Sequence, residues 1–77
     1  MLKNIKGYRF RKCSDINREY PIFELLEGDC ILLDISVSDE GIFEIVLHEA
    51  VAGKIFNFDD MISILAEGRK LLEDEMK

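Results

Sequence analysis

The fold is decided by the stretch ILLDISVSDEGIFEIVL, residues 31–47. On either side of the segment Ser38–Gly41, apolar residues recur at every second position, which is typical of β-strands with one buried face. A three-residue loop, 39–41, sets Val37 opposite Phe43, so the apolar faces of the two strands coincide. Gly41 then falls where a type I turn followed by a bulge needs a left-handed residue. The stretch predicts an antiparallel hairpin.

A two-residue loop, Asp39-Glu40, is the alternative connection, and the parity of the apolar positions argues against it. It would pair odd positions with even ones and set Ile35 opposite Glu44. An acid would then lie on the core face. We therefore predict the three-residue loop, in which Ile35 pairs with Ile45 and Leu33 with Leu47.

A C-terminal helix is predicted from Asn57 to about Glu73. Asn57 is a favourable N-cap, and Asp59 and Asp60 lie in the first turn, where the helix dipole stabilises negative charge. Apolar residues at intervals of three, four and seven mark the face expected to pack on the sheet: Phe58, Met61, Ile62, Leu65, Leu72 and Met76. Ile62 and Leu65 are expected to anchor the core. Gly68 falls on the same stripe, which indicates a close approach of the helix to the sheet.

Three further segments complete the predicted architecture. Residues 8–13 alternate large apolar with basic side chains and predict a strand with one wet face. Residues 54–56 predict a short strand after a turn at 49–53. Residues 21–27 fit either a short helix beginning at Pro21, which we favour, or an edge strand. We predict a single α+β domain, 1–77, with an antiparallel meander of three or four strands packed on one face by the C-terminal helix.

Charge is divided unevenly along the chain. In residues 1–18, six basic side chains and one acid give a net charge of +5. The remaining residues carry four basic and fifteen acidic side chains, a net charge of −11, and the whole chain has a formal charge of −6. Such a surface favours a basic partner and makes most of the molecule a poor ligand for nucleic acid.

No motif for catalysis, cofactor binding or metal binding emerges from the residues. The soft metal ligands are Cys13, Cys30 and His48, without a Cys-x-x-Cys pair or a second histidine. His48 is expected opposite Leu32, on the outer face of the hairpin and next to Cys30. The glycines are isolated and form no phosphate-binding loop. We predict that the chain is not an enzyme and has no catalytic residues, no cofactor and no metal site.

Nucleic-acid binding would require the basic N-terminal part to act. Tyr8-Arg9-Phe10-Arg11 interleaves aromatic and basic side chains, a pattern that can stack bases and hold phosphates. On a strand, however, the aromatic and basic side chains point to opposite faces. The arginines are therefore expected to protect an edge strand, and no nucleic-acid surface is predicted.

The chain is predicted to be soluble and cytoplasmic. Its first residues lack the apolar stretch of a signal peptide, and its longest uninterrupted apolar run is Cys30–Leu33, far too short to span a membrane. Its two cysteines are then expected to be reduced, and no membrane contact is expected.

The outer face of the hairpin is half apolar, whereas a fully solvated face would be largely polar. Either residues 8–13 or 20–27 cover this face, or another chain does. An apolar centre with an acidic rim has the composition of an interaction surface. We predict that this surface consists of Leu32, Asp34, Ile42, Glu44 and Val46.

In size, acidity and the hairpin-plus-helix stretch Asp29–Asp74, the chain resembles the small acidic immunity proteins that bacteria keep in the cytoplasm to neutralise toxin domains. The resemblance implies tight binding to a basic toxin domain, often a nuclease, with acidic residues steering the encounter. It assigns no role to individual residues and does not account for the basic residues 1–18. The alternative is a homo-oligomeric accessory or regulatory protein whose second copy covers the outer face. Both hypotheses describe a protein-binding module.

Overall fold

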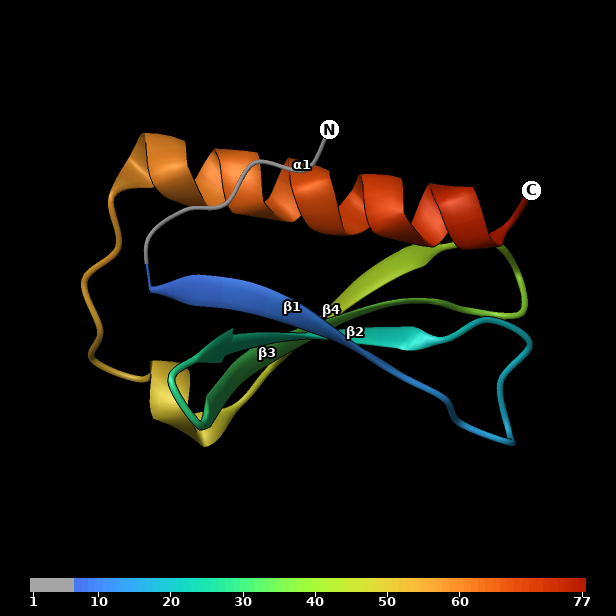
Figure 1. Cartoon of the computed structure of the whole chain (residues 1–77), viewed down its shortest axis with the longest axis horizontal. Coiled ribbons are helices and arrows are strands. Elements are labelled where there is room, and N and C mark those ends of the chain that lie inside the picture. Colours follow the sequence, from blue (N-terminus) through green and yellow to red (C-terminus); the bar gives the residue numbers. More distant parts are fainter. Residues whose placement is uncertain (1–6) are drawn as a thin grey trace.

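Four antiparallel strands form one sheet, and a C-terminal helix packs across one face of it (Figure 1). The computed structural model describes residues 7–77, so Lys3 and Lys6 of the basic N-terminal part lie outside the described residues. The strands lie in the order β1-β2-β3-β4. The predicted α+β architecture is confirmed, with four strands. In chain order the elements are β1 (Tyr8–Cys13), β2 (Ile22–Glu27), β3 (Cys30–Val37), β4 (Phe43–Leu47), the 3-10 turn η1 (Glu49–Val51) and α1 (Phe58–Glu75).

The predicted hairpin register is confirmed between β3 and β4. Val37 lies opposite Phe43, and the pairs Ile35–Ile45 and Leu33–Leu47 follow along the two strands. In the connecting turn, the N–H of Ser38 donates to the carbonyl oxygen of Ile42 at 2.9 Å. Gly41 has a φ of 83°, a left-handed conformation that glycine adopts without steric cost. The parity of the apolar positions is therefore sufficient to predict this register.

Residues 21–27 do not form the favoured short helix; they form β2, which lies between β1 and β3. Phe23, Leu25 and Leu26 are all buried. The register of β2 against β3 shifts between Leu25 and Leu26, the irregularity of a β-bulge. The adjacent Leu25 and Leu26 are both buried, which breaks the alternation of a strand with one buried face, and a short pattern of this kind cannot be told from a short helix by periodicity.

Residues 54–56 form no strand, and the prediction of a strand there is wrong. Ile55 is 97% exposed, while Phe56 packs against the core. The segment crosses from η1, on one side of the sheet, to the start of α1 on the other (Figure 1). Because it passes from one layer to the next at the end of the sheet, it does not run alongside a strand.

The start of α1 is as predicted, and its buried face is as predicted only in part: Gly68 and Leu72 are buried and Leu65 packs against the core, whereas other residues of the predicted stripe are exposed. The side-chain oxygen of Asn57 accepts a hydrogen bond from the N–H of Asp60 at 3.0 Å. The buried positions are Ile64, Gly68 and Leu72, spaced by four and therefore aligned along one side of the helix. Ile62, predicted to anchor the core, is 53% exposed. Among the described residues, no helix is both long and apolar enough to cross a membrane.

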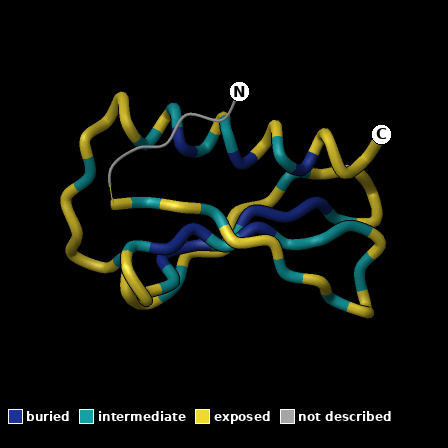
Figure 2. Tube along the Cα trace, viewed as in Figure 1, coloured by how far each residue is buried: buried dark blue, intermediate teal, exposed yellow. Residues whose placement is uncertain are grey.

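Gly68 lies where the helix approaches the sheet, as predicted. A Cβ atom at this position would lie well inside the contact distance of Ile35 Cδ1 and 2.9 Å from Phe10 Cζ. Buried positions run along the central strands and the sheet-facing side of α1 (Figure 2). The absence of a side chain at Gly68 therefore allows the helix backbone to lie directly on β1 and β3.

Candidate interaction surface

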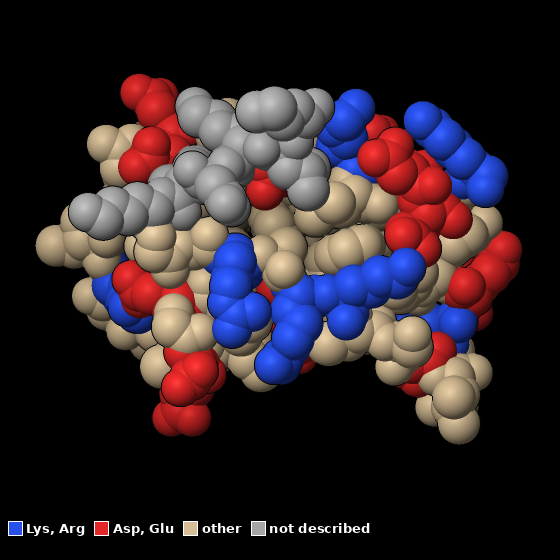
Figure 3. Space-filling view, in the orientation of Figure 1, with Lys and Arg blue, Asp and Glu red and all other residues tan. Residues whose placement is uncertain are grey.

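The two edges of the sheet differ sharply in character. The β1 edge carries three exposed basic side chains: Arg9, Arg11 and Lys12. Arg11 pairs with Glu24, and Lys12 Nζ donates to Glu75 Oε2 at 3.0 Å. Figure 3 shows basic side chains gathered along β1 on this side of the molecule. Charged side chains on an edge strand hinder pairing with another strand, so the β1 edge is protected.

The β4 edge has the opposite character. Within residues 7–77, β4 has β3 as its only neighbour in the sheet. Its apolar side chains are exposed on both faces: Ile45 is 50% exposed and Leu47 67% on the helix side, and Val46 is 50% exposed on the outer side. Ile42, next to the strand, is 57% exposed. An edge strand of this composition is a ready template for another strand.

The backbone of β4 offers an ordered row of donors and acceptors at this edge. His48 N–H donates to Leu32 O at 2.9 Å, and Ser38 N–H donates to Ile42 O at the same distance. Residues of an antiparallel strand alternate between bonding one neighbour and pointing away from it. The even-numbered residues 42–48 therefore bond β3. The N–H and C=O groups of Phe43, Ile45 and Leu47 point to the open edge.

An apolar groove of about 230 Å³ runs beside β4 on the helix side of the sheet. It opens there because α1 packs mainly on β2 and β3, so that Ile45 and Leu47 of β4 remain largely exposed on the helix side. At the start of β4 the helix does reach the strand, because the Arg69 guanidinium lies 4.5 Å from the centre of the Phe43 ring. The groove is lined by Leu33, Ile45, Leu47, Val51, Phe56, Met61 and Leu65. It is continuous with β4 through Ile45 and Leu47.

The segment around β4 is acidic. Residues 38–50 contain no lysine or arginine and four acids, namely Asp39, Glu40, Glu44 and Glu49. All four are exposed, and Glu44 lies on the outer face of β4, across from Ser36. The β4 edge, defined by its free backbone groups and by Ile42, Ile45, Val46 and Leu47, is thus apolar with an acidic surround.

The five predicted surface residues differ in their exposure. Ile42, Glu44 and Val46 are exposed, as an interaction surface requires. Leu32 is fully buried within this chain, so its assignment as a contact residue is wrong. It is covered because the chain leaves β4 at His48, bonds back to Leu32 and turns into η1, which packs on β3. Asp34 is 19% exposed in its side chain and faces His48 instead of open solvent.

Ile45 and Leu47 are exposed residues of this candidate surface that the sequence interpretation missed, because it assigned the whole helix-facing side of the hairpin to the core. A helix is about 10 Å across, whereas neighbouring strands are about 4.8 Å apart. One helix therefore covers about two strands. Three or four predicted strands beneath one helix are the signal that could have identified an uncovered strand.

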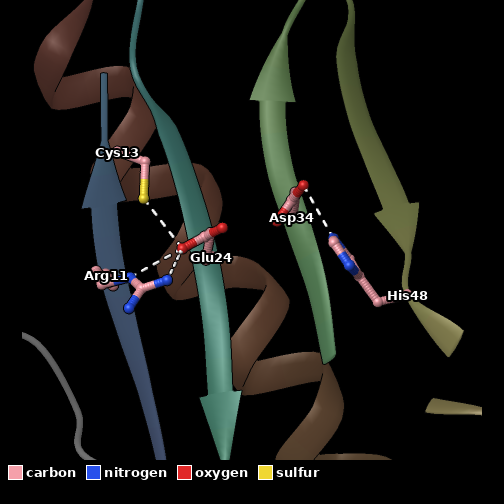
Figure 4. Close-up of polar contacts among 5 residues, drawn as sticks. All are labelled: Arg11, Cys13, Glu24, Asp34 and His48. Atoms are coloured by element: carbon pink, nitrogen blue, oxygen red, sulfur yellow. Dashed lines mark hydrogen bonds and ion pairs between the residues drawn. The ribbon is translucent and has the colours of Figure 1, made fainter. Parts of the chain in front are cut away.

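A second group of polar side chains lies on the outer face, nearer the middle of the sheet (Figure 4). Arg11 and Cys13 of β1 converge on Glu24 of β2, whose Oε1 accepts from Arg11 Nε at 2.9 Å and from Cys13 Sγ at 3.0 Å. The hydrogen bond from Cys13, followed by that from Arg11, lowers the pKa of Glu24. The same carboxylate raises the pKa of Cys13, which holds this side chain as a thiol and makes it a weak nucleophile.

Asp34 lies directly across from Glu24 on β3 and is paired with His48. His48 Nε2 is 3.1 Å from Asp34 Oδ2, without the alignment of a hydrogen bond. Both His48 Nε2 and Asp34 Oδ1 are buried, and neither has a hydrogen-bond partner in the described part of the chain. His48 lies opposite Leu32, as predicted. Within residues 7–77, no three His, Cys, Asp or Glu side chains are placed to hold a metal ion. The pair joins the start of η1 to β3.

Glu24→Gln is expected to flatten the acid side of the stability profile. A carboxyl whose pKa is lowered in the folded state stabilises the fold above its unfolded pKa. That contribution is lost as the pH falls through the lower, folded pKa. The dependence of the unfolding free energy on pH is measured by urea unfolding of the wild type and of Glu24→Gln between neutral pH and about pH 3. Glu44→Gln is the control, and an equally flattened profile for it would contradict the role of Glu24.

Comparison with known proteins finds no matching family model, no matching curated protein and no matching solved structure.

Proposed function

We propose that this chain is a non-enzymatic protein-binding module whose contact surface is the β4 edge together with the apolar groove. One observation carries the proposal: β4 exposes apolar side chains on both faces, beside backbone groups that have no partner among residues 7–77. In this binding mode a partner strand extends the sheet, its backbone supplies hydrogen bonds, and its alternate side chains enter the groove.

The contrast between the two edges supports this proposal. Proteins usually protect edge strands with charge, and β1 has that protection in Arg9, Arg11 and Lys12. The only charged residue of β4 is Glu44. An apolar edge left open in a chain that protects its other edge is a feature of a strand that acquires a partner.

The narrower proposal is an immunity-type role in the cytoplasm, in which the partner is a basic toxin domain. The four acids within residues 38–50 support it, because they lie beside the β4 edge and would attract a basic surface during encounter. Binding of this kind weakens as salt concentration rises.

A homo-oligomeric accessory or regulatory role is the second candidate. It is favoured by the exposure of both faces of the same strand, since a second β4 would bring apolar residues to each of them. Each chain carries a formal charge of −6, so self-association should strengthen as salt screens the repulsion. The direction of the salt dependence distinguishes the two roles.

Val46→Lys is expected to weaken partner binding by roughly tenfold or more, because it introduces a charge at the edge of a dry contact. The probe for the immunity role is the protein encoded beside this chain's gene, with affinity measured by calorimetry. The thermal midpoint of the dilute variant should change little, since Val46 is 50% exposed. Arg9→Glu, on the protected β1 edge, is the matched control. Loss of binding in Arg9→Glu but not in Val46→Lys would contradict the assignment of the surface.

A further inference from the structure

We infer that the occupant of the β4 edge is β4 of a second copy, paired antiparallel about a two-fold axis at Ile45. This inference rests on the proposed function, because it takes β4 as the contact surface and names what binds there. The product is a continuous sheet made of two four-stranded halves. The inference follows from three properties of β4: its free backbone groups, its charge and its faces.

The free backbone groups restrict which residues can pair. Phe43, Ile45 and Leu47 present their N–H and C=O groups to the open edge, because the residues between them bond β3. Hydrogen bonds across the edge therefore require that odd-numbered residues lie opposite odd-numbered residues. A two-fold axis at Ile45 pairs Ile45 with itself and Phe43 with Leu47 in both directions. All three residues of the strand that face the edge are then satisfied.

Neighbouring registers satisfy fewer of these groups. An axis at Glu44 pairs Phe43 with Ile45 and leaves Leu47 beyond the partner strand. An axis at Val46 pairs Ile45 with Leu47 and leaves Phe43 without a strand partner. Since a buried backbone group without a partner costs free energy, the axis at Ile45 is favoured.

The single charge of β4 selects the same register. With the axis at Ile45, Glu44 lies opposite Val46 of the second copy, and Ile42 lies opposite His48. With the axis at Glu44, the two copies of that acid would lie directly opposite each other, which is destabilising. Glu44, the acid that could oppose self-association, therefore lies two positions along the strand from Glu44 of the second copy.

The two faces of β4 are also compatible with this pairing. Directly opposite residues share a face of the sheet, so both copies of α1 lie on the same side. On that side the row across the new contact consists of Phe43, Ile45 and Leu47 from each copy, and the two apolar grooves meet above it. The exposed halves of Ile45 and Leu47 become buried. On the other side, Val46 and Ile42 lose exposure.

Sedimentation equilibrium across a range of concentrations tests the self-association. The wild type is expected to be a dimer that dissociates on dilution and tightens as salt rises. Ile45→Lys, which sets two like charges at the axis, is expected to raise the dissociation constant roughly 30-fold or more. Leu47→Lys, at a more exposed position of the same face, serves as the second variant and is expected to act in the same direction. Circular dichroism of each dilute variant shows whether it is folded.

Cysteine cross-linking tests the register. In a background of Cys13→Ser and Cys30→Ser, Ile45→Cys is expected to form a disulfide between copies under mild oxidation. The hydrogen-bonded pair at the axis separates the Cα atoms by about 5.5 Å, within the range for a disulfide. Leu47→Cys should not cross-link, since it lies four residues along the strand from its own copy. Preferential cross-linking of Glu44→Cys or Val46→Cys would overturn the axis at Ile45.

The failures of the two proposals are distinguishable. A wild type that stays monomeric at all concentrations overturns the second copy as the occupant. The proposed function survives that result if another partner's binding is still weakened by Val46→Lys. A wild-type dimer that neither Ile45→Lys nor Leu47→Lys weakens, although both variants are folded, would overturn self-pairing through β4 and point to a different contact surface.

Discussion

Leu72→Ala is expected to lower the free energy of unfolding by about 2–5 kcal/mol. Leu72 is fully buried in the face of α1 that packs on the sheet, in the same cluster as Phe23 and Ile64. Truncation there removes apolar contacts and leaves a cavity between helix and sheet, which tightly packed surroundings cannot fully close. A domain of this size has only a few kcal/mol of stability, so the variant should be largely unfolded in mild denaturant.

Ile62→Ala is the matched control on the same helix. Ile62 is 53% exposed, so its truncation is expected to cost less than about 1 kcal/mol. Leu65 is partly buried against the core, so the loss of unfolding free energy in Leu65→Ala should lie between those of Ile62→Ala and Leu72→Ala. Urea unfolding monitored by circular dichroism measures all three. An equal loss in Ile62→Ala and Leu72→Ala would mean that the buried face of α1 is misassigned.

Gly68→Leu is expected to cost about 3 kcal/mol, at the upper end for overpacking. The first atom of the new side chain would already crowd Ile35 and Phe10, and the remaining atoms would have to displace the helix from the sheet. The gain in helix propensity on replacing glycine, about 1 kcal/mol, offsets part of this loss.

Ala66→Leu is the control for Gly68→Leu, because Ala66 is exposed on the same helix. It adds bulk without entering the contact with the sheet and should leave the unfolding free energy within about 0.5 kcal/mol of the wild type. If Gly68→Leu were as stable as Ala66→Leu, the close contact between helix and sheet would be contradicted.

The elements predicted correctly are those specified by local signals. The β3–β4 register follows from the parity of apolar positions and from Gly41, and the start of α1 follows from Asn57. Each of these signals lies within a few residues of the feature that it determines. The two misassigned segments, 21–27 and 54–56, depend instead on where the rest of the chain lies. The segment 21–27 resembles a helix because the adjacent Leu25 and Leu26 are both buried, which breaks the alternation of a strand.

The error in the buried face of α1 has a related cause. Apolar residues of this helix lie in two different environments. Ile64 and Leu72 face the core, whereas Met61 lines the open groove beside β4. Phe58 and Ile62 are apolar but exposed. A stripe drawn through all apolar positions averages these directions and is displaced from the buried face. Because the helix leaves this part of β4 uncovered, Ile45 and Leu47 are exposed, although the sequence interpretation assigned them to the core.

Part of the candidate surface could be predicted from the sequence. Ile42, Glu44 and Val46 are identified because apolar residues on a face expected to be wet are anomalous. Leu32 belongs to the same pattern, yet η1 covers it, and a 3-10 turn that folds back onto the sheet has no periodic signature. The free backbone groups of β4 follow only from strand order, which the sequence does not determine.

Amide hydrogen exchange along β4 tests most directly whether this strand is the contact surface. In the dilute chain, the amides of Phe43, Ile45 and Leu47 should exchange rapidly, while those of Glu44 and Val46 are protected by their bonds to β3. When the chain is concentrated or bound to a partner, the three odd-numbered amides should become protected. If they remain unprotected in a complex that protects another surface instead, β4 is not the contact strand.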